Sequence, residues 1–439
     1  MDKIKVTGGI PLFGTVAISG SKNAALPIII SSLLTDGMLE VSNIPVLADI
    51  KTLYKILEVL GVHIDLINNH TISFTAANIS ELTAPYELVK TMRASVLVLG
   101  PLLSRFGKCQ VALPGGCAIG PRPVNFHLAA LEQMGADIVI EEGYIKASVK
   151  GRLKGANITF PKISVGATEN TLMAATLAEG QTVINNAAME PEITDLALCL
   201  KAMGADISGI GTSCLTVNGT NKLKGAKYSV LPDRIETATY MIAAAITGGK
   251  LALTDTRPGD LTAVSEALKK MGVEITETDS TITVDGRNRS LVGIDIVTEP
   301  YPGFPTDVQA QIMALMLTAK GGSTITETIF ENRFMHVPEM QRMNADIRFI
   351  NDTSVAIAGE SKLKGAPVMA SDLRASAGLV LAALAAEGDT LIERVYHLDR
   401  GYEALESKLS ACGANIIRLH DDKEETKAKD SVQNGTTTL

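Results

Sequence analysis

The chain has no tryptophan and only 4% aromatic residues, so its apolar packing depends on Ala, Leu, Ile, Val and Met. So few aromatic side chains argue against a surface on which nucleic-acid bases stack, and a net charge of −8 argues against a phosphate-backbone partner. A small anionic ligand remains compatible with that charge, because a site can be locally basic inside an acidic protein. We therefore expect no nucleic-acid partner.

Cysteine and histidine are also sparse. Five scattered cysteines without a CxxC pair, and six histidines without ligand spacing, predict neither a disulfide framework nor a metal site. The first residues show no basic segment followed by an apolar run, so we expect no signal peptide. The most apolar segments, such as 379–386, are too short to span a bilayer. These features predict a cytoplasmic protein without a membrane partner.

A repeated pattern organises the 439 residues, a length sufficient for two or three domains. A helix-like stretch, then glycine or asparagine, then an alternating strand recurs about every 70 residues. Glycine, and next best asparagine, ends a helix in the left-handed conformation. The residues at this position are Gly61, Gly135, Gly204, Gly272, Asn344 and Gly413.

Another helix, rich in small apolar residues, precedes each of these stretches, which predicts six buried helices in close contact. We therefore predict an α/β fold of six βαβαββ units, with central helices inside and sheets outside. The last residues, 420–439, are polar and lack periodicity, which predicts a disordered tail.

Basic residues begin four of the six buried helices, where the helix dipole disfavours a cation by about 0.3–1 kcal/mol. Helix N-termini themselves attract anions, so this recurrence indicates a shared anionic ligand. A solvated side chain is the alternative interpretation, and we prefer it for Arg234. The four residues are Lys22, Arg93, Arg234 and Arg374.

Carboxylates, Glu169 and Asp307, take roughly the corresponding places in the other two units, where either could be a helix cap. Asp307 follows a Gly/Pro-rich approach, which suits a group that binds a sugar hydroxyl or accepts its proton. Arg400 lies just before a helix, and its alternative interpretation is a salt bridge with Asp399 or Glu403.

The segment 113–123, LPGGCAIGPRP, places Cys117 among three glycines and three prolines. Glycine lets the backbone approach a ligand closely, and proline precludes regular structure. Arg122 beside the thiol can activate it and hold an anion. The segment therefore predicts a mobile, reactive lid, although most free cysteines are small buried apolar residues.

As a set, these motifs resemble the UDP-N-acetylglucosamine enolpyruvyltransferases of the EPSP synthase superfamily, over residues 4–419. The resemblance implies two domains of three units each, one over 22–230 with the lid and the other over 1–21 plus 231–419. Crossing strands near 19–21 and 230–233 would join them. The matching motifs are SGSKNAALP, MRASVLVLGPLL, LPGGCAIGPRPV, LPDRIETATY, GFPTDVQAQ, FENRFMHVPEM, SDLRAS and YHLDRGYE.

The resemblance also implies the reaction: transfer of the enolpyruvyl group of phosphoenolpyruvate to the 3′-hydroxyl of UDP-N-acetylglucosamine, the first committed step of bacterial peptidoglycan synthesis. It implies no cofactor and no metal. Cys117 would protonate the methylene carbon, carry a pyruvate adduct and react with fosfomycin, and Asp307 would take or orient the hydroxyl proton. Lys22 and Arg400 would complete the catalytic set.

The implied binding residues form two groups. Those for phosphoenolpyruvate are Lys22, Asn23, Arg93, Arg122, Arg374 and Arg400. Those for UDP-N-acetylglucosamine are Asn23, Arg93, Arg122, Pro123, Val124, Asn125, Phe126, Lys162, Ser164, Val165, Gly166, Asp307 and Ile329.

Three alternatives remain open from the sequence. A shikimate-pathway enolpyruvyl synthase shares the fold and chemistry but not a cysteine loop of this kind. An RNA 3′-phosphate cyclase would need an adenylylated histidine, for which neither His127 nor His336 has a convincing context. A non-catalytic sugar-nucleotide-binding paralogue would have no need of Lys22, Cys117, Asp307 and Arg400 together. The sequence gives no oligomeric state.

Overall fold

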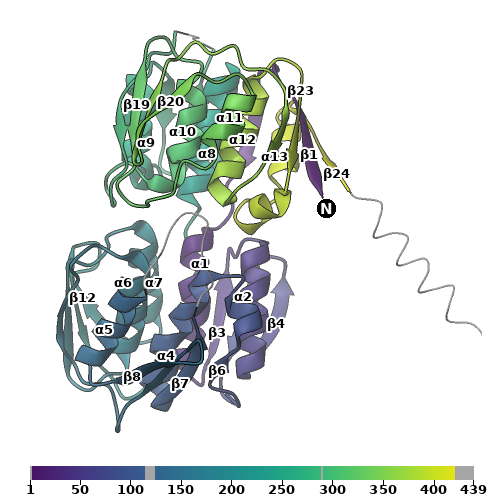
Figure 1. The fold of residues 1–439 in the computed structure, drawn as a ribbon. Helices are drawn as coiled ribbons and strands as arrows, with labels where there is room; N and C mark the ends of the chain where they lie inside the picture. The colour runs from purple at the N-terminus through teal and green to yellow at the C-terminus, as the bar shows by residue number, and fades with distance from the viewer. Residues whose placement is uncertain (1, 114–123, 288–289, 421–439) are drawn as a thin grey trace, which may run out of the picture.

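The computed structural model describes residues 2–113, 124–287 and 290–420. These residues form two lobes, one above the other in Figure 1. Each lobe contains three four-stranded sheets, and all six sheets have one pattern: a parallel pair of strands extended by two antiparallel strands. This is the sheet expected from a βαβαββ unit, so the predicted fold class is confirmed.

The first lobe, the lower one in Figure 1, holds the elements from the first helix to the fourteenth strand. Its helices are α1 (Lys22–Ile30), η1 (Ser31–Leu34), α2 (Ala48–Leu60), α3 (Tyr86–Val89), η2 (Arg93–Val98), α4 (Leu99–Phe106), α5 (Asn125–Gln133), α6 (Val165–Thr176) and α7 (Pro191–Ala202). Its strands are β3 (Met38–Ser42), β4 (His63–Asn68), β5 (Thr71–Thr75), β6 (Thr83–Ala84), β7 (Lys108–Ala112), β8 (Asp137–Glu141), β9 (Tyr144–Ser148), β10 (Asn157–Thr159), β11 (Gln181–Asn185), β12 (Asp206–Ser208), β13 (Cys214–Asn218) and β14 (Ala226–Ser229).

The second lobe combines the first two strands of the chain with everything after β14. Its helices are α8 (Arg234–Thr247), η3 (Pro258–Leu261), α9 (Thr262–Lys270), η4 (Thr306–Val308), α10 (Gln309–Met316), α11 (Val337–Arg342), α12 (Leu373–Ala385), η5 (Val395–Arg400) and α13 (Leu405–Ala411). Its strands are β1 (Lys3–Thr7), β2 (Phe13–Ala17), β15 (Lys250–Thr254), β16 (Glu274–Glu277), β17 (Ile282–Asp285), β18 (Ile296–Val297), β19 (Ser323–Thr326), β20 (Ile347–Asn351), β21 (Ser354–Ile357), β22 (Pro367–Met369), β23 (Asp389–Glu393) and β24 (Asn415–Leu419).

The helices predicted to be central are buried in both lobes. In α8 every residue from 235 to 247 is buried, and α8, α10 and α12 contact one another. Small residues permit this close packing: a Cβ added to Gly378 on α12 would lie 2.8 Å from the carbonyl oxygen of Ala310 on α10. Among the described residues, the buried apolar side chains form two clusters, one in each lobe.

The six predicted helix ends adopt the left-handed conformation. Their φ angles are 101° at Gly61, 92° at Gly135, 102° at Gly204, 96° at Gly272, 69° at Asn344 and 100° at Gly413. At each of them the chain leaves an outer helix and enters the strand that follows. These ends confirm the repeat that the sequence predicts.

The chain passes between the lobes twice, at two segments that lie side by side. The amide of Ser21 donates to the carbonyl of Leu231 at 2.8 Å, and the amide of Asp233 donates to that of Ser19 at 2.9 Å. As a result the leading strands are exchanged. β2 pairs in parallel with β15 of the second lobe, and β14, which directly precedes the second crossing, pairs in parallel with β3 of the first.

No helix of the described part of the chain is long and apolar enough to cross a membrane. Apart from His420, the predicted tail over 420–439 lies outside the described residues, and so does the predicted lid over 113–123 apart from Leu113.

Candidate active site

A buried carboxylate, Asp49 of α2, links the start of α1 to the end of η5 at the junction of the lobes. Its Oδ2 lies 3.4 Å from Lys22 Nζ at the start of α1. Its Oδ1 accepts a 2.8 Å hydrogen bond from Arg400 Nε at the end of η5. Asp49 and Lys22 belong to the first lobe and Arg400 to the second, so this ion-pair cluster spans the junction.

Asp49 is a residue that the sequence analysis missed. It lies in the first turn of α2, and its two partners are 27 and 351 residues away in sequence, so no local motif marks it. The structure pairs Arg400 with Asp49, whereas the alternative interpretation placed it against Asp399 or Glu403. Asp399 pairs with Arg418, and Glu403 accepts a hydrogen bond from the amide of Val46.

Lys22 is 8% exposed, and its position is fixed from both sides of the crossing. Ser21 caps α1 by accepting a bond from the amide of Ala24, and the amide of Lys22 donates to Asp233 Oδ2 at 3.3 Å. Burial lowers the pKa of the Lys22 ammonium, Asp49 raises it, and Arg374 and Arg400 lower it. A buried ammonium beside two guanidinium groups is favourable only where anions compensate it, and an anionic ligand would do so.

Asp307 is held by two guanidinium groups. Arg333 Nη2 donates to its Oδ1 at 2.9 Å, and Arg374 Nε donates to its Oδ2 at 3.1 Å. Burial would raise the pKa of this carboxyl, but Arg374, Arg333 and Lys22 hold it well below its usual range. In this arrangement Asp307 can accept a hydrogen bond from a hydroxyl, and it is a weak base. Asp307 lies in η4 and caps no α-helix with its side chain.

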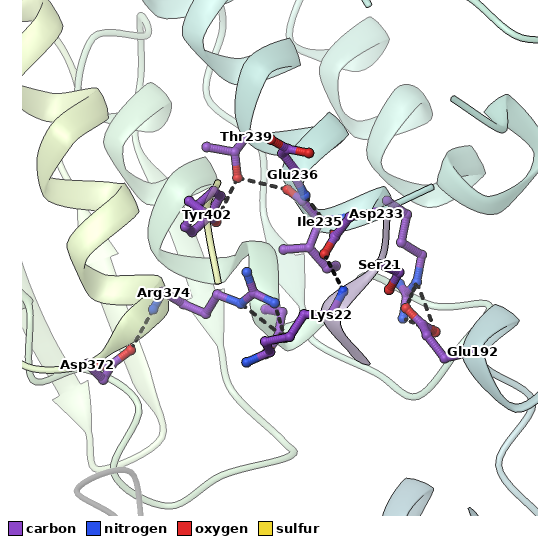
Figure 2. Close-up of polar contacts among 12 residues, drawn as sticks. Ser21, Lys22, Glu192, Asp233, Ile235, Glu236, Thr239, Asp372, Arg374 and Tyr402 are labelled. Atoms are coloured by element: carbon purple, nitrogen blue, oxygen red, sulfur yellow. Dashed lines mark hydrogen bonds and ion pairs between the residues drawn. The ribbon is translucent and has the colours of Figure 1, made fainter. Parts of the chain in front are cut away.

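Arg374 approaches Lys22 from the second lobe, as Figure 2 shows. Its amide is capped by Asp372, which accepts at 2.9 Å at the start of α12. Its guanidinium lies over the ring of Tyr402 at 5.5 Å, and its side chain is 4% exposed. Lys22, Arg374, Arg400 and Asp307 are therefore brought together, each from the beginning or end of a helix.

Arg234 differs from our preferred interpretation, because it is not a solvated side chain. It lies 10% exposed against Glu192 of α7, with its Nε 3.0 Å from Oε1 and its Nη2 3.2 Å from Oε2. This pair also spans the junction, since Glu192 lies on α7 of the first lobe and Arg234 on α8 of the second. The cation at the start of α8 is thus compensated by protein rather than ligand.

One interpretation of Glu169 was a helix cap, but its side chain does not occupy the cap position. The cap of α6 is Ser164, and Glu169 is the fifth residue of the helix. Burial, together with Glu192 and Glu190 nearby, raises its pKa well above the ordinary value.

The residues predicted to contact the sugar nucleotide lie mostly on two neighbouring helices of the first lobe. Asn125 and Phe126 begin α5, Val165 and Gly166 begin α6, and these helices are packed together. Val124 and Ser164 occupy the two N-cap positions, and Lys162 lies just before the second.

Arg93 begins η2 and lies near His127 of α5, whose pKa is lowered to about 4 by burial and by Arg93. The predicted α-helix at Arg93 is therefore a 3₁₀-helix in its first six residues. Asn23 is the second residue of α1. The amide of Ile329 donates to Glu327 at 2.8 Å, so a ligand contact with the backbone there would use the carbonyl oxygen. Cys117, Arg122 and Pro123 lie outside the described residues.

Within the ranges 2–113, 124–287 and 290–420, no group of three His, Cys, Asp or Glu side chains is arranged to hold a metal ion. The charged groups that converge at the junction are guanidinium and ammonium groups with the carboxylates Asp49 and Asp307. Such an arrangement can bind a small ligand that carries both phosphate and carboxylate, and it can orient a hydroxyl beside them.

Comparison with known proteins supports this interpretation. Residues 6–409 match the family model of EPSP synthase (3-phosphoshikimate 1-carboxyvinyltransferase). The chain is 60% identical over 433 residues to the UDP-N-acetylglucosamine 1-carboxyvinyltransferase of Paramagnetospirillum magneticum, with 97% of this chain and all of the relative covered. It is 54% identical to the enzyme of that name from Shewanella denitrificans, with 95% of this chain and all of the relative covered.

Solved structures show the same fold. The enolpyruvyl transferase NikO from Streptomyces tendae superposes with a TM-score of 0.86 at 24% identity, over 95% of this chain and 99% of that one. EPSP synthase from Acinetobacter baumannii superposes with a TM-score of 0.74 at 21% identity, over 96% of this chain and all of that one.

The six-unit fold and the family match define an enzyme class, and the chain belongs to the EPSP synthase family of enolpyruvyl transferases. Within that family its relatives at 54–60% identity are the UDP-N-acetylglucosamine 1-carboxyvinyltransferases, which confirms the resemblance seen in the sequence. The shikimate-pathway alternative is correspondingly disfavoured.

Proposed function

We propose that this protein transfers the enolpyruvyl group of phosphoenolpyruvate to the 3′-hydroxyl of UDP-N-acetylglucosamine and releases phosphate, in the cytoplasm, as the first committed step of peptidoglycan synthesis. The observation that carries the proposal is the convergence of Lys22, Arg374 and Arg400 from both lobes beside Asp307. The relatives named for this reaction, which match nearly the whole chain, support it.

The reaction proceeds by addition and then elimination. In the addition, the 3′-oxygen forms a bond to C2 of phosphoenolpyruvate, the hydroxyl loses its proton, and the methylene carbon gains one to become a methyl group. In the elimination, the methyl group loses a proton, the double bond re-forms and the C2–O bond to phosphate breaks. Atoms balance, and phosphate is the only group that leaves.

The cations supply electrostatic stabilisation. In our proposal Lys22, Arg122 and Arg400 contact the phosphate and carboxylate of phosphoenolpyruvate most directly, and Arg93 and Arg374 extend the positive wall. Each charge-assisted hydrogen bond contributes about 1.5–3 kcal/mol. Since Arg400 comes from the second lobe and Lys22 from the first, a ligand that bridges them also holds the lobes together.

Asp307 has the role of orienting the 3′-hydroxyl. The two guanidinium groups that lower its pKa make it a good hydrogen-bond acceptor but a poor proton acceptor. It becomes a base only when Arg374 or Arg333 turns towards the substrate instead. This sharpens the sequence-based assignment, which left both roles open.

Cys117, in the segment 113–123, has the role of donating a proton to the methylene carbon from a lid that closes over the bound sugar nucleotide. The sequence and the family resemblance support this role. Hydrogen exchange of peptides covering 113–123 is expected to slow when UDP-N-acetylglucosamine is added, and an unchanged rate would contradict the lid.

Phosphate release from phosphoenolpyruvate is the test of the proposed function. Wild-type protein is expected to release phosphate only when UDP-N-acetylglucosamine is present, and Cys117→Ser is expected to release it far more slowly. Release that depends on shikimate 3-phosphate instead would identify the shikimate-pathway reaction. Binding of the sugar nucleotide without any release would identify a non-catalytic paralogue.

A further inference from the structure

Glu327, a buried carboxylate just after β19, is not among the predicted site residues, but it is bonded to the amide of Ile329 and to the residue beside Asp307. It is 2% exposed. Its Oε1 accepts hydrogen bonds from the Ile329 amide at 2.8 Å and the Phe330 amide at 3.2 Å. Its Oε2 accepts a 2.8 Å bond from the hydroxyl of Thr306, the residue directly before Asp307.

A fourth bond fixes the carboxylate to the sheet. The Thr298 hydroxyl, fully buried after β18, donates to Glu327 Oε1 at 2.9 Å and accepts from the amide of Thr328 at 3.0 Å. Since β18 and β19 are parallel neighbours, Thr298 and Glu327 leave the same edge of the sheet together. Glu327 is therefore anchored to a rigid element while its remaining bonds reach into loops.

The two ends of the segment 327–333 thus bind two consecutive residues, Thr306 and Asp307. At one end Glu327 holds Thr306, and at the other Arg333 donates to Asp307 Oδ1 at 2.9 Å. Arg333 is itself buried, 4% exposed in its side chain, and its guanidinium lies 5.2 Å from the ring centre of Phe330. Between these ends lies Ile329, whose backbone we place against the sugar nucleotide.

We propose that Glu327 is a positioning residue for enolpyruvyl transfer, which fixes the Asp307 carboxylate and the Ile329 backbone relative to each other and so aligns the sugar hydroxyl. The inference deepens the proposed function and rests on it. Glu327 touches no substrate in this proposal. It acts through Thr306 and through the amides of Ile329 and Phe330. Lys22 and Arg400 lie on α1 and η5 and pair with Asp49, so binding of phosphoenolpyruvate should be spared.

Three variants separate positioning from a general loss of structure. Glu327→Ala removes both acceptor oxygens and leaves four donors without their acceptor. Glu327→Gln keeps one oxygen for the amides, and its amide group can donate to the Thr306 hydroxyl. Thr306→Val removes only the link towards Asp307. Thr247→Val is the matched control, because Thr247 lies at the far end of α8, where its buried hydroxyl donates to the carbonyl of Ala243.

Steady-state phosphate release, with each substrate varied in turn, gives the readout. Glu327→Ala is expected to lose about 10- to 100-fold in kcat/KM for UDP-N-acetylglucosamine, as misplacement by an ångström does. Its KM for phosphoenolpyruvate should stay within about threefold of wild type. Glu327→Gln should restore most of the loss, and Thr306→Val should lose about 3- to 10-fold and add nothing further to Glu327→Ala. Thr247→Val should match wild type.

Several results would overturn the inference. They are an unchanged kcat/KM for UDP-N-acetylglucosamine in Glu327→Ala, equal losses for both substrates, additive losses with Thr306→Val, or a Gln variant as impaired as the Ala variant. If Glu327→Ala does not fold, Thr306→Val against Thr247→Val decides, and equal effects count against positioning. UDP-N-acetylglucosamine-dependent activity of the wild type tests the proposed function separately, so an active wild type beside an unaffected Glu327→Ala removes only this inference.

Discussion

Asp49→Asn changes the charge at the lobe junction with almost no change of volume, and it is expected to move the alkaline limit of activity to lower pH. Asp49 lies 3.4 Å from Lys22 Nζ. At that distance a unit charge pair contributes about 5 kcal/mol at an effective dielectric constant of about 20, and about 1 kcal/mol in water. Asp49 raises the pKa of Lys22 against the lowering effects of burial, Arg374 and Arg400.

Without that carboxylate the Lys22 ammonium loses its proton more readily. Because we propose that the charged form binds phosphoenolpyruvate, kcat/KM for this substrate should fall at a lower pH. Even the smaller Coulomb energy, about 1 kcal/mol, corresponds to a pKa change of about one unit. We therefore expect the alkaline limb of the Asp49→Asn pH profile to move by at least that much. Below that limb the attraction between the lobes should also weaken, since Arg400 would face a neutral amide with one acceptor oxygen instead of a carboxylate with two.

The assay is the initial rate of phosphate release at low phosphoenolpyruvate concentration between pH 6 and pH 10. Asp36→Asn is a suitable control, since Asp36 pairs with Lys222 on the surface and should leave the profile unchanged. In a Lys22→Arg background the displacement should vanish, because a guanidinium does not titrate in this range. Identical alkaline limbs for wild type and Asp49→Asn would refute the reasoning.

Three further predictions follow from other parts of the structure. Burial raises the pKa of Asp195 from 3.8 to about 6, so the folded state takes up a proton between these values and stability falls as pH rises through them. In urea denaturation, the unfolding free energy of Asp195→Asn minus that of wild type should therefore increase by roughly 3 kcal/mol from pH 3.5 to pH 7. A difference that stays constant with pH would contradict this. Either Glu192→Gln or Arg234→Met alone should destabilise the protein by about 3–5 kcal/mol, whereas the double variant should recover most of that loss, as a double-mutant cycle would show. Intact-protein mass spectrometry should find one fosfomycin adduct that disappears in Cys117→Ser and persists in the control Cys214→Ser, and an adduct that remains in the former would exclude Cys117 as its site.

Local features of the sequence predicted the fold well. A left-handed helix end depends on the backbone conformation of a single residue. Gly61 and its equivalents could therefore be identified without knowing which residues pack around them. Asn344 shows that the same position tolerates the residue next best suited to it. The burial of α8 and α12 followed from their continuous apolar composition in the same way.

The site was predicted less completely, because its interactions join segments far apart in the chain. Arg234 was interpreted as solvated because its partner, Glu192, comes from the other lobe. Asp49 could not be identified because carboxylates are common in the first turn of a helix, and its two cationic partners are evident only in the structure. Arg93 opens a 3₁₀-helix where an α-helix was predicted, a difference that side-chain periodicity does not resolve at a helix end.

The exchange of leading strands has a consequence for biosynthesis. β1 pairs with β23 and β24, and β2 with β15, so residues 3–17 find their places only beside segments that are translated much later. Ile4 and Val6, completely buried in the folded protein, stay without their strand partners until residues 389–419 have been translated. The lobe that contains the N-terminus is therefore the last to close, while the other can condense as soon as residue 231 has emerged.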